Sequence, residues 1–217
     1  MPKPPTLRFT LPWTAYEGAR VAPPEAQPRD PRRGRSVLSD APPLTYIENA
    51  GTPIEIDCFK IDGLYRHLAD CPLTIPGVLG FVRKYGLLRA RKRESFELIC
   101  GEIRAMRSLV AAMDRGNWPA LNDWARQNEA VVRTSAVLHF EPDRWRPYLF
   151  FQPRDLIGAA YLQLLSNASD DAQLRQCALP GCGTWFVYGP GHKHRETARY
   201  CSPTCQKAHA YLKTKEV

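Results

Sequence analysis

The segments Cys177-Ala-Leu-Pro-Gly-Cys182 and Cys201-Ser-Pro-Thr-Cys205, eighteen residues apart, decide how the last part of this 217-residue chain folds. Two close cysteine pairs joined by a short insert are the pattern with which proteins build a tetrahedral thiolate cage for zinc. Each pair holds the ion from one side, and the insert folds back to bring the pairs together. The sequence therefore predicts a structural zinc site whose ligands are Cys177, Cys182, Cys201 and Cys205.

The insert between the pairs has the pattern of a β-hairpin. Residues 184–188 are apolar and aromatic and predict a strand, and the glycines and proline of 189–191 predict a turn. We expect residues 197–200 to return beside the strand as its partner. The first cysteine pair, with four residues between its members, needs a bulged loop, which Pro180 and the neighbouring glycines permit.

The second pair lies at the start of a predicted helix over 203–214. Ser202 is an N-cap residue and Pro203 takes the first helical position, so Cys205 falls in the first turn. A loop, a hairpin and a helix that supplies the last ligand form a treble-clef-like finger. His209, one helical turn after Cys205, is an alternative ligand, although four cysteines already complete the site.

The whole chain divides into three parts. Residues 1–43 hold ten of the twenty prolines and a basic cluster, and they predict a largely irregular basic arm. Residues 44–170 predict a mainly helical α+β domain with a small β-hairpin. Residues 171–217 form the predicted zinc finger.

Hydrophobic periodicity predicts the elements of the middle part. The strongest pattern spans 95–115, where the apolar residues form one stripe, Gly116 ends the helix and Asn117 caps the next one. The other predicted elements are short strands at 44–47 and 54–56 around a turn at 49–51, helices over 61–71, 76–88 and 153–166, and a hairpin of 131–140 with 145–151.

Composition limits the classes of function. The chain has a net charge of +8, which favours a polyanionic partner such as nucleic acid but also fits an ordinary solvated basic surface. It has no apolar run long enough to span a membrane, and its first residues lack the apolar core of a secretory signal. Seven unevenly placed cysteines without an export signal indicate reduced thiols, so we expect a cytoplasmic protein.

Residue patterns typical of catalysis are not found. The sequence has no glycine-rich phosphate loop, nucleophile elbow or paired-carboxylate pattern. Cys58, His67 and Cys71 offer only three irregularly spaced ligands for a second metal site. We therefore expect the protein not to be an enzyme.

Basic residues in the finger are candidates for phosphate contacts with DNA. These residues are Lys193, Arg195, Arg199, Lys207 and Lys213. A second basic run, over 83–93, has two interpretations: a solvated helix end and loop, or another phosphate-contacting surface.

The finger resembles a known family. The stretches Cys182-Gly183-Thr184-Trp185-Phe186 and Arg199-Tyr200-Cys201-Ser202-Pro203-Thr204-Cys205 are similar to the bacterial CGNR zinc finger. The preceding region, with Trp118–Asn122, the hairpin and the helix over 153–166, resembles the ABATE domain that accompanies it. The resemblance covers roughly residues 90–217. It implies a stress-induced transcriptional regulator that binds DNA through the finger.

The chain departs from the family pattern in two places. The first cysteine pair has four spacers where two are usual, and Gln206-Lys207-Ala208 stands where the family has Gly-Asn-Arg.

The stretch 200–209 also resembles the end of a MYND-type protein-interaction finger, without the ligands for its second zinc. The predicted function is thus a DNA-binding transcriptional regulator, which can also form a homodimer or bind a protein partner. The alternative is a protein-interaction adaptor with a structural zinc.

Overall fold

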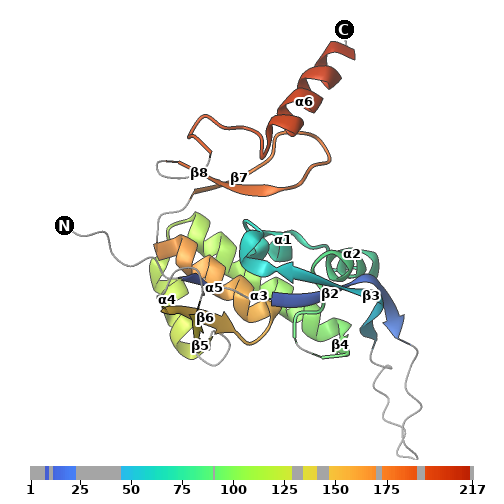
Figure 1. Ribbon diagram of the computed structural model, residues 1–217, viewed down its shortest axis with the longest axis vertical. Coiled ribbons are helices and arrows are strands. Elements are labelled where there is room, and N and C mark those ends of the chain that lie inside the picture. The colour runs from blue at the N-terminus through green and yellow to red at the C-terminus, as the bar shows by residue number, and fades with distance from the viewer. Residues whose placement is uncertain are drawn as a thin grey trace, which may run out of the picture.

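A computed structural model gives the fold, in which helices and small sheets form a larger body and a C-terminal unit lies at one end of it (Figure 1). The structure describes residues 8–9, 12–22, 45–89, 91–128, 134–140, 147–169, 173–189 and 194–215. About half of these residues are helical, and the sheets are small and mostly antiparallel.

The N-terminal part of the chain contributes a strand to the body. Antiparallel pairing joins β2 (Pro12–Ala22) to β3 (Tyr46–Asp57) and β3 to β4 (Arg93–Ser95). Ala15 and Ala19 of β2 are buried, as is Ile47 of β3. The expectation of an irregular arm over residues 1–43 is therefore wrong for β2 and for the short strand β1 (Arg8–Phe9). The prolines of the first 43 residues all lie outside 13–22. The backbone N–H groups of that segment are therefore available for pairing with a neighbouring strand.

The predicted turn at 49–51 is instead part of β3. Gly51 has a φ of 84°, and the register with β2 shifts between Tyr16 and Gly18. A glycine with positive φ lets one strand bulge and bend without reversing the chain. The prediction of two short strands around a turn is therefore wrong, because β3 is one bent strand.

Helix α3 is the centre of the body. The helices, with one short 3-10 turn, are η1 (Cys58–Lys60), α1 (Leu64–Asp70), α2 (Ile75–Tyr85), α3 (Phe96–Asp114), α4 (Trp118–Gln127) and α5 (Leu156–Ser169). α3 packs against α1, α2, α4 and α5, and Ile103 and Met106 of its predicted apolar stripe are fully buried. Gly116 ends the helix with a φ of 65°, and the Asn117 side chain accepts the N–H of Ala120 at 3.4 Å. These helix ends confirm the predicted caps.

The predicted hairpin is present and leads into α5. β5 (Thr134–Phe140) pairs antiparallel with β6 (Pro147–Pro153), and β1 (Arg8–Phe9) lies parallel to β6. Asp155 then caps α5, since its carboxylate accepts the N–H of Gly158 at 3.0 Å. The predicted helix over 153–166 therefore starts later than expected, after Asp155.

The C-terminal unit contains β7 (Gln173–Gln176), β8 (Trp185–Tyr188) and α6 (Pro203–Lys215), and α6 points away from the body (Figure 1). The strand at 185–188 and the helix confirm their predictions. The predicted partner of β8 is wrong, because β8 pairs with β7 and not with residues 197–200. The loop from Cys177 to Cys182 reverses the chain, so the strands on its two sides meet. In the described part of the chain, no helix has the length and apolarity needed to cross a membrane.

Candidate metal centre

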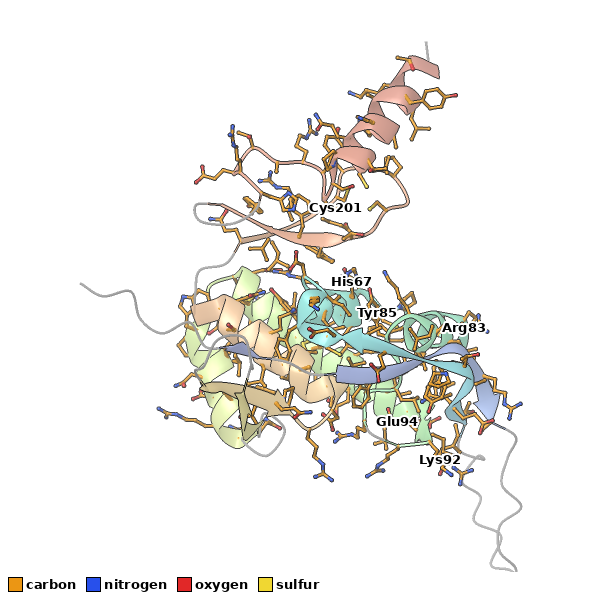
Figure 2. The ribbon with its side chains drawn as sticks, in the orientation of Figure 1. His67, Arg83, Tyr85, Lys92, Glu94 and Cys201 are labelled. Carbon is orange, nitrogen blue, oxygen red and sulfur yellow. The ribbon has the colours of Figure 1, made fainter. Side chains whose placement is uncertain are left out.

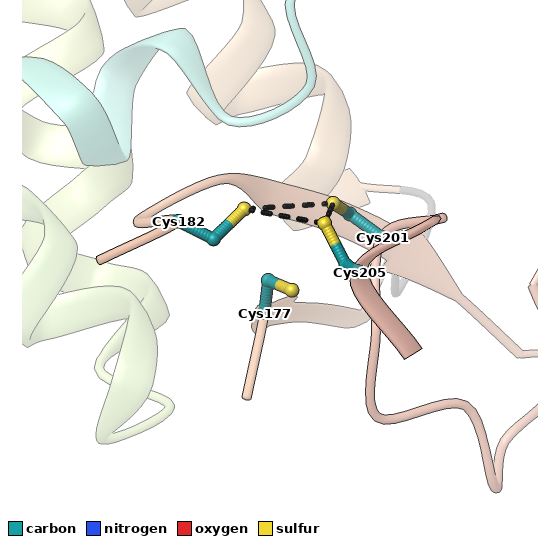
Figure 3. Close-up of side chains that lie close together, drawn as sticks. All are labelled: Cys177, Cys182, Cys201 and Cys205. Carbon is teal, nitrogen blue, oxygen red and sulfur yellow. Dashed lines mark hydrogen bonds between the residues drawn. The ribbon is translucent and has the colours of Figure 1, made fainter. Parts of the chain in front are cut away.

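The four predicted cysteines lie together in the C-terminal unit. Their sulfur atoms are all within 4.8 Å of one another, and they can hold a metal ion (Figure 3). The Sγ of Cys182 lies 3.7 Å from that of Cys201 and 3.8 Å from that of Cys205, and the last two are 3.6 Å apart. Cys177 is buried and the other three are half-buried.

Backbone hydrogen bonds fix the loop that carries the first pair. The N–H of Cys177 donates to the carbonyl of Thr184 at 2.9 Å, and the N–H of Cys182 donates to that of Leu179 at 3.1 Å. Gly181 and Gly183 have φ values of 78° and 62°, a backbone region that favours glycine. The four-residue spacer thus forms a compact turn that points both sulfurs inward.

The helix start fixes the second pair. The Ser202 hydroxyl accepts the N–H of Cys205 at 3.2 Å, as the N-cap prediction requires. Cys205 therefore lies in the first turn of α6, where backbone N–H groups and the helix dipole favour negative charge. His209 does not join the cluster, and its Nδ1 lies 3.0 Å from the Tyr200 hydroxyl.

The pKa values of two of the cysteine thiols are shifted in opposite directions. The adjacent Thr184 hydroxyl and backbone N–H lower the pKa of the Cys182 thiol to about 6. Burial and hydrogen bonds from neighbouring cysteines raise the pKa of Cys201 to about 12. A divalent cation at the centre would favour the ionised form of all four, so its binding would release protons.

Four of the five predicted DNA-contacting residues belong to the described part of the unit. Arg195, Arg199, Lys207 and Lys213 are exposed, and Lys193 falls outside the described residues. Arg195 and Arg199 line a groove of about 440 Å³ that also includes Ser202 and Gln206 at the start of α6.

Arg175 supports the loop that carries these arginines. Its guanidinium donates to the carbonyls of Glu196 at 3.1 Å and Ala198 at 2.7 Å, and it lies over the Tyr188 ring at 4.0 Å from the centroid. The sequence analysis missed this residue. Its two hydrogen-bond partners, Glu196 and Ala198, lie more than twenty residues later in the chain, so no local sequence pattern identifies them.

The second basic run, over 83–93, is partly engaged by the body. Arg83 donates to the carbonyl of Ala19 at 3.3 Å, and Arg89 pairs with Glu102 at 2.6 Å. Lys84, Arg91 and Lys92 are exposed. Figure 2 shows Arg83 and Lys92 well away from the C-terminal unit. Arg83 and Lys92 therefore do not extend the basic surface of that unit, whereas Lys84 lines a cavity between the unit and the body.

Trp185 joins the C-terminal unit to the body. Its indole N–H donates to the Asp70 carboxylate at 3.0 Å, and the Arg66 guanidinium lies 5.0 Å from its ring centroid. Arg66 is itself held by Asp114, with one hydrogen bond of 2.7 Å. A Cβ on Gly63 would lie 2.7 Å from that of Trp185, so only glycine fits this approach.

Replacing Gly63 with alanine is expected to lower the free energy of unfolding by about 1–3 kcal/mol, because the new Cβ collides with Trp185 and the φ of 68° is strained. Gly80→Ala is the matched control. Its new Cβ would have no atom of the described residues within 4 Å, and alanine in a helix is expected to stabilise by about 0.5–1 kcal/mol. Urea unfolding measures both. Equal stabilisation by the two substitutions would contradict the close approach at Gly63.

The structure brings the four predicted cysteines together and leaves Arg195, Arg199, Lys207 and Lys213 exposed. The sequence analysis did not identify the contacts between the two parts of the chain.

Comparison of the chain with models of known protein families, with curated proteins and with solved structures found no match in any of the three.

Proposed function

We propose that this chain is a DNA-binding transcriptional regulator whose C-terminal unit is a treble-clef finger held by zinc. The sulfur geometry supports the zinc part of this proposal, and the groove lined by Arg195 and Arg199 supports the DNA contact. Thiolates about 2.3 Å from a zinc ion at tetrahedral corners lie about 3.8 Å apart. The distances of 3.6, 3.7 and 3.8 Å among the sulfurs of Cys182, Cys201 and Cys205 fit that spacing, and the Cys177 sulfur lies within 4.8 Å of all three.

Zinc bound by Cys177, Cys182, Cys201 and Cys205 would cross-link the loop after β7 to the start of α6. Four thiolates leave no open position for a water or a substrate, which favours a structural role over catalysis. The sequence resemblance to CGNR fingers is part of this proposal, and so is a cytoplasmic location. The order of loop, strand and ligand-bearing helix supports a treble clef.

DNA contact is proposed for the groove beside α6. Arg195 and Arg199 line this groove beside the start of α6, where their positive charge attracts phosphate. Arginine also binds phosphate through two parallel hydrogen bonds. Gln206 lines this groove, and Lys213, seven residues later, lies on the same face of α6. Lys207 adds a charge on an adjacent face.

A protein-interaction adaptor is the second candidate, and the outer end of α6 favours it. Tyr211 and Leu212 are 59% and 42% exposed on a helix that points away from the body (Figure 1). Exposed aromatic and aliphatic side chains side by side are typical of protein contacts. In this second candidate function, zinc holds α6 in place for a partner or for a second copy of the chain.

Selection of bound fragments from sheared genomic DNA by the zinc-loaded protein tests the first candidate. Enrichment of a shared sequence is the expected result. With four phosphate contacts, affinity is expected to fall about a hundredfold between about 50 and 200 mM salt. Zinc-loaded protein that enriches no sequence, or whose binding is insensitive to salt, would contradict the proposal and favour the adaptor.

A further inference from the structure

A cavity of about 670 Å³ lies between the C-terminal unit and the body. On the body side it is lined by Lys60, Asp62 and His67, together with Lys84 and Tyr85 at the end of α2. On the other side it is lined by β8 and by His194 and Cys201. Figure 2 shows His67 on the part of the body that faces the unit carrying Cys201. A volume of this size is typical of a small-molecule site.

Aromatic rings line both walls of this interdomain cavity. Tyr85 comes from the body, and Trp185 and Phe186 come from β8. The His67 ring lies 5.5 Å from that of Tyr85, and the His194 ring lies 4.8 Å from that of Phe186. Tyr85 and Phe186 are only 5% and 1% exposed, so the half-buried rings of His67, Trp185 and His194 are the ones on which a planar ring can pack.

The polar groups of the cavity are divided between its walls. Lys60 and Lys84 belong to the body, whereas Cys201 belongs to the candidate metal centre. Burial, with a smaller effect of Lys84, lowers the pKa of His67 to about 4, so this imidazole is neutral at pH 7. The two lysines are therefore the cationic side chains of the body wall, and Asp62 is its carboxylate.

The charge of the metal centre sets the polarity of the cavity. A zinc ion with four thiolates carries a net charge of −2, and this step rests on the proposed function. An acidic group would be repelled near Cys201 and attracted near Lys60 and Lys84. A ligand with several negative charges would be disfavoured, because the centre and Asp62 are both negative. One acidic group at the edge of a planar ring fits this arrangement.

We propose that the interdomain cavity binds a planar aromatic monocarboxylate, with its ring among His67, Trp185 and His194 and its carboxylate toward Lys60 and Lys84. Such a ligand contacts both parts of the chain at once. The concentration of the ligand would therefore control how firmly the C-terminal unit is held against the body.

Isothermal titration calorimetry of the full, zinc-loaded chain tests this site. The probe is indole-3-acetate, and its neutral counterpart is indole-3-acetamide. We expect saturable binding of the acid and binding about tenfold weaker or worse for the amide, as the loss of one charged partner implies. Absence of acid binding, or equal affinity for acid and amide, would overturn the proposal.

Lysine variants locate the bound acid. Lys84→Met and Lys60→Met are each expected to weaken binding of indole-3-acetate about threefold, because both lysines are exposed. Lys92→Met removes the same charge from an exposed lysine distant from the cavity and is expected to leave the affinity unchanged (Figure 2). Equal weakening by all three variants, or by none, would place the acid elsewhere and overturn the proposal.

The titration contains no DNA, so its outcome is separate from that of the proposed function. A chain that binds DNA but not the acid overturns this inference alone. A chain that binds the acid at the lysines but selects no DNA supports the cavity and overturns the regulator.

Discussion

Replacing Cys201 with serine is expected to release the metal from the C-terminal unit and to unfold the segment from β8 to α6. Structural zinc sites contribute about 10–16 kcal/mol, shared among four ligands, so the loss of one thiolate is expected to weaken zinc affinity by about two orders of magnitude. The body is expected to stay folded, because its own buried core includes α3 and α5. Metal content after dialysis against a chelator measures the first effect, and circular dichroism measures the second.

Cys100→Ala is the control for the loss of a thiol. Cys100 is buried on α3 and lies outside the four-cysteine cluster, so this variant is expected to retain one zinc per chain. Stoichiometric zinc in Cys201→Ser after the same dialysis would show that Cys201 is not a required ligand. It would also remove the main support for the treble-clef proposal.

The paired substitution Arg195→Ala and Arg199→Ala is expected to weaken DNA binding strongly without loss of zinc. Removal of two phosphate contacts is expected to reduce the slope of log affinity against log salt by about 2. At moderate salt the affinity is expected to fall by one to two orders of magnitude, roughly 1–3 kcal/mol. Fluorescence anisotropy with a labelled duplex over a series of salt concentrations measures both quantities.

Arg115→Ala with Arg126→Ala is the matched control, because it removes the same charge from exposed arginines of the body. This double variant is expected to change the affinity little. An equal loss of DNA affinity in both double variants would indicate a general effect of net charge. An unchanged affinity in the variant that lacks Arg195 and Arg199 would show that DNA does not bind in the groove beside α6.

Local patterns predicted the parts of this structure that depend on near neighbours. The stripe and caps of α3 and α4 involve residues within a few positions of one another, and the same holds for the Ser202 cap of α6. The cysteine spacing predicted the cluster, because a tetrahedral cage constrains all four sulfurs at once.

Contacts between distant segments could not be predicted in this way. β8 has the composition of a strand, but nothing in it specifies β7 as its partner over residues 197–200. Gly63 is one of fourteen glycines, and its role depends on a tryptophan more than a hundred residues later. The interdomain cavity is likewise made of side chains from separate segments, and it exists only once the two parts of the chain meet.

The pairing of β2 with β3 determines where this chain can be divided. A shortened chain that begins at Thr45 would keep every helix described above but would leave the twelve-residue β3 without its partner along most of its length. Unpaired N–H and C=O groups on a strand edge recruit strands from other molecules. Such a fragment would self-associate through β3. Residues 12–22 therefore protect the edge of β3 from aggregation, and the intact body includes both β2 and β1, which pairs with β6.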